Sequence, residues 1–190
     1  MDFPELYILR HGQTEWNAED RMQGWLNSPL TPQGLREAAR QHDIMRQRDL
    51  TGFQVLSSPS GRAFQTAAIA LGSLVDTIHT DLRLREIDVG DWAGQLRAGL
   101  PKADGPDAYL KQYEAAPKGE GLVGLRARVQ GFLGDLVQPS VLVTHGITGL
   151  ILRQLLIGDA AMQGLGPDDG PNGGQGMVFH LKDGAQTLLR

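Results

Sequence analysis

The stretch LYILRHGQTEWN (Leu6–Asn17) is an apolar run that ends abruptly in charged and polar residues. Its first part, Leu6–Leu9, has the apolar character of a buried strand. Arg10, His11 and Gly12 follow directly. In open α/β sheets, ligands bind outside the carboxyl ends of the strands. The stretch therefore predicts a strand that delivers a cation and an imidazole to a ligand-binding edge.

A second strand of the same kind is predicted in the last third of the chain. Ser140–Thr144 runs into His145 and Gly146, and an apolar helix is predicted over Gly149–Ile157. Both strands then present a His-Gly pair to one edge of the same sheet. The two pairs predict a site that contains two imidazoles.

The rest of the chain alternates between strand-like and helix-like segments. Further strands are predicted at 53–56 and 77–79, with a closing hairpin at 177–181 and 187–189. Helices are predicted at 32–47, 60–71, 107–115 and 122–137, whereas 13–30, 82–92 and 158–176 have loop character. The alternation predicts an α/β fold: a three-layer α/β/α sandwich whose mostly parallel central sheet has one antiparallel strand. We expect a single domain over residues 1–190, with a small excursion at about 96–121 near the active site.

The composition is that of an ordinary globular protein, with 41% hydrophobic and 21% charged residues among 190. A net charge of −4 and the lack of a Lys/Arg run argue against a nucleic-acid partner. The chain has no cysteine, which excludes disulfides, thiolate metal sites and cysteine nucleophiles. Because neither a signal-peptide pattern nor an apolar run of about 20 residues is present, we expect a cytoplasmic protein with no membrane partner. Oligomeric state is not indicated.

Several residues expected at loop edges form a set that suits the binding of an anionic group. They are Arg10, His11, Asn17, Arg62, Glu86, His145 and Gly146. Guanidinium groups form paired hydrogen bonds that match the geometry of phosphate, which a lysine cannot reproduce. Taken one at a time, these residues are weak evidence. A lone histidine is more often structural, and Glu86 could instead form a surface ion pair with Arg83 or Arg85.

Five stretches of the chain carry a family pattern. They are Leu9–Asn17, Leu30–Gly34, Ser57–Ala67, Leu84–Gly94 and Val143–Gly146. In this order they resemble the histidine phosphatase superfamily, in its phosphoglycerate-mutase-like branch. The resemblance spans nearly the whole chain and is more specific for fold and phosphoryl chemistry than for substrate. One departure is Gly119-Glu120-Gly121, where many relatives carry Gly-Glu-Ser.

The resemblance implies roles for the polar residues. His11 would be the nucleophile that forms a phosphohistidine, and His145 would donate a hydrogen bond to the phosphoryl group as an imidazolium. Arg10 and Arg62 would clamp the phosphoryl oxygens. Glu86 would be the general acid and base, because a leaving alkoxide needs a proton and nearby phosphate favours a protonated carboxyl group.

Further contacts to substrate are expected around these groups. Asn17 would donate to the phosphoryl oxygens, and the amides at the helix start near Gly146 would attract an anion. Gln23 and Gly24 follow the family's loop pattern and would line the pocket.

We therefore expect a metal-independent phosphomonoesterase that acts on a small phosphorylated metabolite and needs no cofactor. The short excursion at 96–121 and the Leu84–Gly94 stretch resemble the phosphatases of the family more than its mutases. A phosphoglycerate mutase is the alternative, and a non-catalytic phosphate-binding protein is a third.

Overall fold

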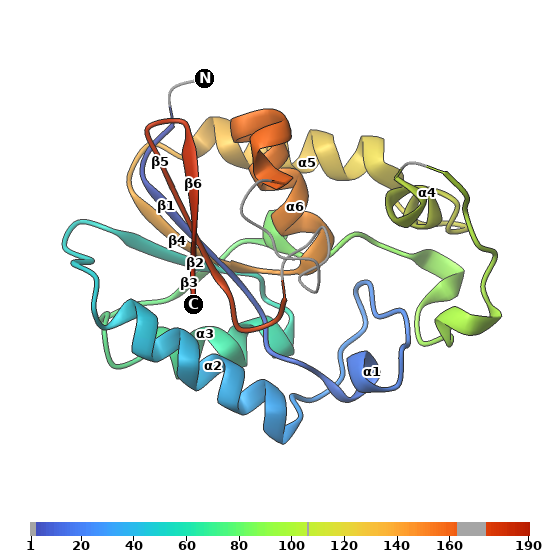
Figure 1. Ribbon diagram of the computed structural model, residues 1–190, viewed down its shortest axis with the longest axis horizontal. Helices are drawn as coiled ribbons and strands as arrows, with labels where there is room; N and C mark the ends of the chain where they lie inside the picture. Colours follow the sequence, from blue (N-terminus) through green and yellow to red (C-terminus); the bar gives the residue numbers. More distant parts are fainter. Residues whose placement is uncertain (1–2, 106, 163–173) are drawn as a thin grey trace.

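A computed structural model describes residues 3–105, 107–162 and 174–190 of the chain. Its centre is a six-stranded sheet in the order β3-β2-β4-β1-β5-β6 (Figure 1). The strands are β1 (Leu6–Arg10), β2 (Gln54–Ser57), β3 (His79–Thr80), β4 (Ser140–Thr144), β5 (Val178–Lys182) and β6 (Ala185–Leu189). β1 pairs in parallel with β4, and β2 with β4 and β3, whereas β5 is antiparallel to both β1 and β6. Within the described residues the sheet is mostly parallel with one antiparallel strand, β5, as predicted.

Helices cover both faces of this sheet because the side chains of β1 alternate between two cores. Leu6 and Ile8 belong to a core shared with α5 (Gly121–Asp135) and α6 (Gly146–Ile157). Tyr7 and Leu9 point to the opposite face, into a core shared with α2 (Pro32–Met45) and α3 (Gly61–Leu71). Figure 1 shows the two helix pairs on either side of the sheet. The predicted three-layer sandwich is confirmed.

The register of the two central strands brings the two His-Gly pairs together. Arg10 is opposite Thr144 in the parallel ladder, and the backbone N–H of His11 donates to the Thr144 carbonyl at 3.0 Å. His11 and His145 therefore leave adjacent strands at the same edge of the sheet.

Some local predictions were wrong. α1 (Glu15–Ala18) lies in a segment predicted as loop, and a capping box between Thr14 and Asn17 stabilises it. β3 begins two residues later than predicted, and α6 begins at Gly146, three residues earlier. Both differences concern element ends, where contacts with other parts of the chain set the boundary.

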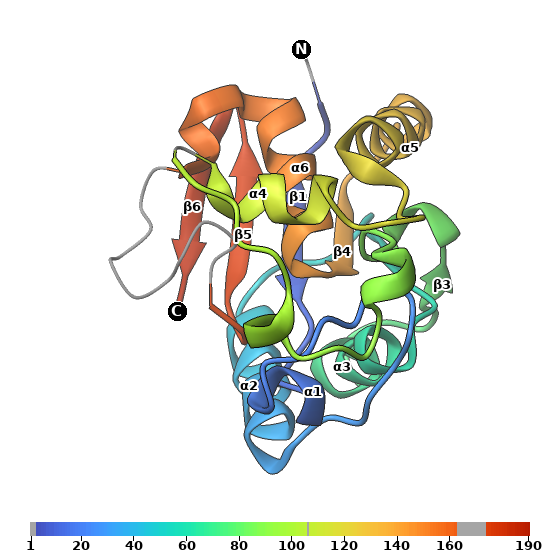
Figure 2. The same ribbon diagram turned by 90° about the vertical axis from the view of Figure 1, so that its right-hand side faces the viewer.

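The excursion at 96–121 contains the 3-10 turn η3 (Arg97–Gly99) and the helix α4 (Ala108–Glu114). In Figure 2 α4 lies in front of the sheet. Three further 3-10 turns are η1 (Leu82–Leu84), η2 (Gly90–Trp92) and η4 (Gly158–Met162). The segment predicted as a loop at 158–176 thus begins with a turn, and its residues 163–173 lie outside the described ones.

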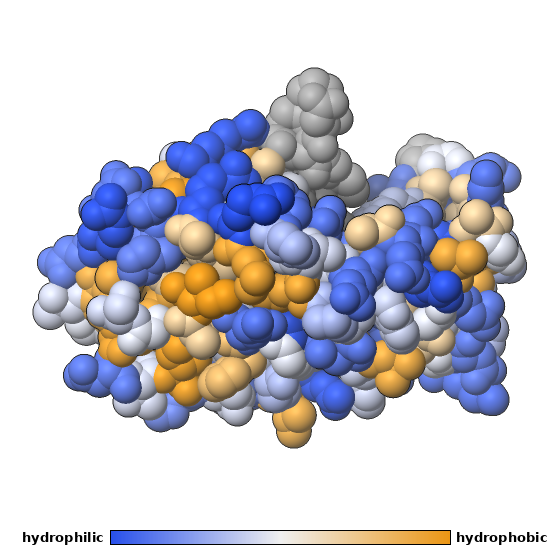
Figure 3. Space-filling model, turned by 90° about the horizontal axis from the view of Figure 1, so that it is seen from below, coloured by the Kyte–Doolittle hydropathy of each residue, from blue (hydrophilic) through white to orange (hydrophobic). Residues whose placement is uncertain are grey.

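The β5–β6 hairpin forms as predicted. Asp183 and Gly184 have φ angles of +51° and +76°, which a two-residue type I′ turn requires. None of the described helices has both the length and the apolar character needed to cross a bilayer. Figure 3 shows the face formed by the α2–α3 layer, where apolar side chains gather among polar ones.

Candidate active site

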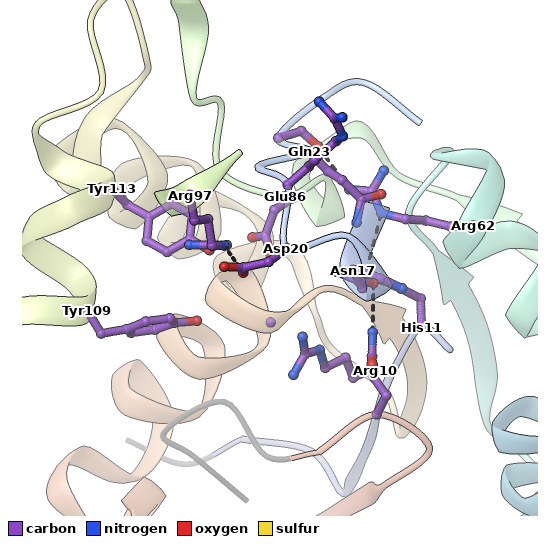
Figure 4. A pocket seen from close by; sticks show the side chains of 14 residues that line it. Arg10, His11, Asn17, Asp20, Gln23, Arg62, Glu86, Arg97, Tyr109 and Tyr113 are labelled. Atoms are coloured by element: carbon purple, nitrogen blue, oxygen red, sulfur yellow. Dashed lines mark hydrogen bonds and ion pairs between the residues drawn. The ribbon is translucent and has the colours of Figure 1, made fainter. Parts of the chain in front are cut away.

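A cavity of about 270 Å³ opens where β1 and β4 end. Eight of the nine residues predicted for the site line it: Arg10, His11, Asn17, Gln23, Gly24, Arg62, Glu86 and Gly146. Figure 4 shows most of these side chains directed into the cavity. The ninth residue, His145, is fully buried beside them, with its ring edge-on to that of His11 and 5.1 Å between ring centroids.

His11 is held in one tautomer. Its Nδ1 lies 2.7 Å from the carbonyl oxygen of Gly12. Because a carbonyl only accepts hydrogen bonds, Nδ1 carries the ring proton and Nε2 keeps its lone pair. Burial, followed by the charges of Arg62 and Arg10, lowers the pKa of His11 well below its usual value. The unliganded site therefore holds a neutral imidazole whose Nε2 has the lone pair that a nucleophile needs.

Arg62 lies in the first turn of α3 and is buried. Its Nε donates to His11 Nε2 at 3.3 Å, while Nη1 and Nη2 donate to the carbonyls of Leu26 and Gly24 at 2.7 and 2.9 Å. Burial lowers the pKa of Arg62 to about 10, so the side chain stays charged at neutral pH. Each terminal nitrogen retains a second N–H that can reach a phosphate oxygen.

Gly24 is required by the backbone at this point. Its φ is +53°, and a Cβ there would lie 2.7 Å from the side chain of Val89. The left-handed turn directs the Gly24 carbonyl toward Arg62, which ties the loop to α3.

Ser58 fixes the second imidazole. Its hydroxyl lies 2.8 Å from His145 Nε2 and accepts from the backbone N–H of Ser60 at 3.3 Å. If Ser58 donates its single proton to Nε2, the neutral ring carries its proton on Nδ1. That buried Nδ1 has no hydrogen-bond partner among the described residues, so it can donate to a ligand.

The structure gives the protonation state of His145 only for the unliganded site. Burial, followed by the charge of Arg62, lowers the pKa of His145 well below its usual value. The unliganded site thus holds a neutral imidazole, whereas the predicted imidazolium concerns the site with a phosphoryl group bound. The resemblance carried no information on how deeply the ring is buried.

Glu86 occupies the start of α6. Its Oε2 accepts from the backbone N–H of Ile147 at 3.1 Å, and its Oε1 accepts from those of Thr148 and Ile87 at 3.0 and 2.9 Å. Two of the helix-start amides, those of Ile147 and Thr148, therefore bind this carboxylate, whereas Gly146 lines the cavity. Oε1 accepts from two amides and Oε2 from one, which leaves Oε2 as the less engaged oxygen.

The alternative of a surface ion pair for Glu86 is not observed. Arg83 pairs with Asp81 and Asp135 at 2.8 and 2.6 Å. The guanidinium of Arg85 lies over the Trp25 ring at 4.3 Å. Neither arginine forms an ion pair with Glu86 in the described structure.

Arg128 of α5 holds the loop that carries Glu86. Its Nη1 donates to the carbonyls of Arg83 and Arg85 at 2.7 and 2.9 Å, and its Nη2 to that of Glu86 at 3.2 Å. The carboxylate of Glu120 accepts hydrogen bonds from Nη2 and Nε of Arg128 at 2.5 and 3.1 Å. Glu120 belongs to the Gly-Glu-Gly stretch that departs from the family pattern, and its carboxylate anchors Arg128.

Asn17 and Gln23 present amide groups to the cavity. Asn17 Oδ1 accepts from the Thr14 backbone and from Gln175 Nε2, at 3.1 and 2.7 Å, which leaves its Nδ2 for a ligand. Gln23 Nε2 donates to the Thr14 hydroxyl at 2.8 Å, and its buried Oε1 has no partner among the described residues.

Six further residues line the cavity and were not predicted as part of the site. They are Asp20, Arg21, Arg97, Tyr109, Tyr113 and Gln175. Arg97, Tyr109 and Tyr113 come from the excursion, which was expected near the site without named residues. The sequence allowed two interpretations of Arg21, a contact to a second anionic group of a substrate or, more simply, a solvated charge.

Metal-binding side chains do not cluster in the described part of the chain. No group of three His, Asp or Glu side chains there is arranged to hold a metal ion. The positive charge of the cavity comes from its arginines.

Comparison with known proteins agrees with this geometry. A sequence profile described as histidine phosphatase superfamily (branch 1) matches residues 6–166. A protein of Proteus mirabilis named probable phosphoglycerate mutase is 35% identical, over 80% of this chain and 74% of its own. The glucosyl-3-phosphoglycerate phosphatase of Mycobacterium tuberculosis is also 35% identical, over 77% of this chain and 71% of its own.

Solved structures give the same family. A mycobacterial glucosyl-3-phosphoglycerate phosphatase in complex with VO3 superimposes with a TM-score of 0.77 at 30% identity, covering 98% of this chain and 97% of its own. A phosphoglycerate mutase of Thermus thermophilus gives a TM-score of 0.72 at 30% identity, covering 98% and 96%. This chain belongs to the histidine phosphatase superfamily.

Proposed function

We propose that the protein is a metal-independent phosphomonoesterase acting on a small phosphorylated metabolite. The observation that carries this proposal is the tautomer of His11, whose unprotonated Nε2 lies in a cavity that Arg10, Arg62 and Glu86 also line. Phosphoryl transfer needs mainly positioning and charge stabilisation, which Arg10 and Arg62 supply to the phosphoryl oxygens.

The reaction proceeds in two displacements. His11 Nε2 attacks phosphorus, the P–O bond to the alcohol breaks, and protonated Glu86 gives its proton to the departing oxygen. Glu86 then takes a proton from water, whose oxygen attacks phosphorus and releases His11 and inorganic phosphate. Oε2 of Glu86, with a single amide donor, is the oxygen that carries this proton. The Nδ1–H of His145 and the amide of Asn17 donate to the phosphoryl oxygens.

Phosphoglycerate mutation is the second candidate, because the Proteus mirabilis and Thermus thermophilus relatives are named as mutases. The two activities differ in whether phosphate reaches water or returns to a substrate hydroxyl. The small size of the excursion and the phosphatase-like Leu84–Gly94 stretch favour hydrolysis.

The test offers 3-phosphoglycerate and a panel of phosphate monoesters with a chelator present, and follows free phosphate and 2-phosphoglycerate together. Phosphate release by the wild type is expected to disappear in His11→Ala and to persist in His79→Ala, which removes an exposed histidine outside the cavity. Isomerisation without phosphate release would establish the mutase. Unchanged turnover by His11→Ala would overturn the assignment of the nucleophile.

A further inference from the structure

The end of the cavity away from His11 is built by two loops. Leu96 forms an isolated antiparallel bridge with Arg21, and the backbone N–H of Arg97 donates to the carbonyl of Asp20 at 2.9 Å. These contacts tie the excursion to residues 20–21. In Figure 4 Arg97, Tyr109 and Tyr113 lie across the cavity from His11 and Arg62. This distal end faces the organic part of a substrate whose phosphate is at His11.

Arg97 is held in place by its neighbours. Its Nη2 donates to the Tyr113 hydroxyl at 2.5 Å, and its guanidinium lies over the Tyr113 ring at 5.3 Å. Its Nε is 3.5 Å from Asp20 Oδ1, an ion pair that Figure 4 marks. The charge of Arg97 therefore already has a carboxylate beside it.

Arg21 also has a carboxylate beside it. Its Nε is 2.6 Å from Glu19 Oε2, and its Nη1 donates to the Gly94 carbonyl at 2.9 Å. Both cations at the distal end thus have their own carboxylate. Residues 163–173, which the structure does not describe, contain no Lys, Arg or His. Among the side chains that line the cavity itself, a second anionic group at this end would meet Asp20 and two arginines that each already have a carboxylate. The exposed Lys102 lines only the adjoining hollow, which shares Asp20, Arg97 and Tyr109 with the cavity.

Neutral polar groups remain at this end. The side chain of Tyr109 lines the cavity, and its hydroxyl makes no hydrogen bond to the described residues. The carboxylate of Asp20 is 71% exposed and can accept further hydrogen bonds. A hydroxyl group both donates and accepts, so it suits a phenol beside a carboxylate.

We propose that the pocket takes monophosphate esters of uncharged, hydroxyl-bearing alcohols, such as sugar monophosphates. It disfavours esters whose alcohol carries a carboxylate or a second phosphate. The proposal rests on the proposed phosphatase function and adds the class of substrate. Asp20 and Arg97 are the residues that set this preference.

The test compares kcat/KM for ribose 5-phosphate, glucose 6-phosphate and 3-phosphoglycerate in wild type and Asp20→Asn. Asparagine keeps the size of aspartate and tolerates the φ of +54° at this position. The wild type is expected to prefer the better sugar phosphate about tenfold or more. Asp20→Asn leaves Arg97 without its carboxylate, so the ratio for 3-phosphoglycerate over sugar phosphate should rise about three- to fivefold, the size expected of a partly exposed ion pair.

Asp43→Asn is the matched control, because it removes the same charge from an exposed ion pair with Arg46 outside the cavity. It should leave the ratio unchanged. Where turnover is slow, inhibition constants against p-nitrophenyl phosphate give the same ratio. A wild type that prefers 3-phosphoglycerate, or a ratio that Asp20→Asn leaves unchanged or lowers, would overturn the proposal. His11-dependent hydrolysis of p-nitrophenyl phosphate would then still support the phosphatase, whereas its absence would remove the phosphatase itself.

Discussion

At His11 a single hydrogen bond selects the reactive atom. The Gly12 carbonyl accepts a hydrogen bond from Nδ1–H. The lone pair of the ring is therefore on Nε2, where it points toward a buried guanidinium. His145 is oriented in a similar way by the Ser58 hydroxyl. Both rings are buried beside arginines, which disfavour the protonated form of each. The unliganded site therefore keeps both imidazoles neutral.

This neutrality makes stability depend on pH. In the unfolded chain both histidines bind a proton as pH falls below about 6.5. In the folded state their pKa values are lower, so they stay neutral over the range just below that value. The unfolded state then binds more protons, and the free energy of unfolding falls as pH drops, by up to about 1.4 kcal/mol per pH unit for each histidine.

Urea denaturation at pH 7.5 and 5.5 checks this prediction. His11→Asn removes one of the two histidines that bind a proton on unfolding at low pH. The variant should therefore lose less stability between the two pH values than the wild type does. His79→Asn removes an exposed histidine and should behave like the wild type. Equal losses in the wild type and His11→Asn would contradict the burial argument.

Among the secondary-structure elements, the helices α5 and α6 hold the loop that carries Glu86. Glu86 lies in neither a helix nor a strand. The first turn of α6 binds its carboxylate, and Arg128 of α5 binds the carbonyls around it. Because two helices of one layer hold both ends of the residue, small shifts between α5 and α6 would change the direction in which Glu86 delivers its proton.

Arg128→Met tests this arrangement, since methionine keeps the apolar stem and removes the donors. We expect kcat for an alkyl phosphate to fall tenfold or more and kcat for an aryl phosphate to fall less, because a phenolate needs little protonation to leave. Stability should fall by about 1–3 kcal/mol from the carbonyls and the Glu120 carboxylate that lose their donor. Arg126→Met on the same helix, whose guanidinium contacts Gln154, is the control. Equal slowing of both esters would show that Arg128 does not act through Glu86.

The elements also show what the sequence could predict. α2 has the start signals Thr31 and Pro32 and was placed within two residues. The four-residue helix α1 was not predicted, because the capping box of Thr14 stabilises it and its sequence has no apolar periodicity. The cavity residues near His11 could be predicted because each belongs to a local motif. Arg97 and Tyr109 could not, because long-range backbone contacts such as the Arg21–Leu96 bridge and the Arg97–Asp20 hydrogen bond bring the excursion to the cavity.

For the molecule as a whole, the site joins parts of the chain that are far apart in sequence. Arg10 and His11 follow β1, Arg62 begins α3, Glu86 lies in a loop, and Gly146 begins α6. A ligand that bridges these segments binds only the folded state and therefore stabilises it. We expect inorganic phosphate to be such a ligand.

Thermal denaturation with added phosphate tests this coupling. At 100 times its Kd, phosphate should add about 2.7 kcal/mol, which for a domain of this size raises Tm by roughly 5–10 °C. Arg62→Lys should reduce the shift at the same phosphate concentration, because lysine cannot form paired hydrogen bonds to the anion. Sodium chloride at equal ionic strength is the control. The prediction fails if chloride raises Tm as much as phosphate does.

The position of β1 within the sheet has a consequence for biosynthesis. Leu6 pairs with Ser140 on one side and Leu181 on the other, so the first strand has no neighbour from nearby sequence. At translation rates of 5–20 residues per second, its apolar residues wait roughly 10–30 s before β4 has been made, and longer for β5. During that interval the nascent chain exposes Leu6–Leu9, a short apolar stretch that can pair with other chains. We therefore expect the strand that leads to His11 to need protection from association while the protein is being made.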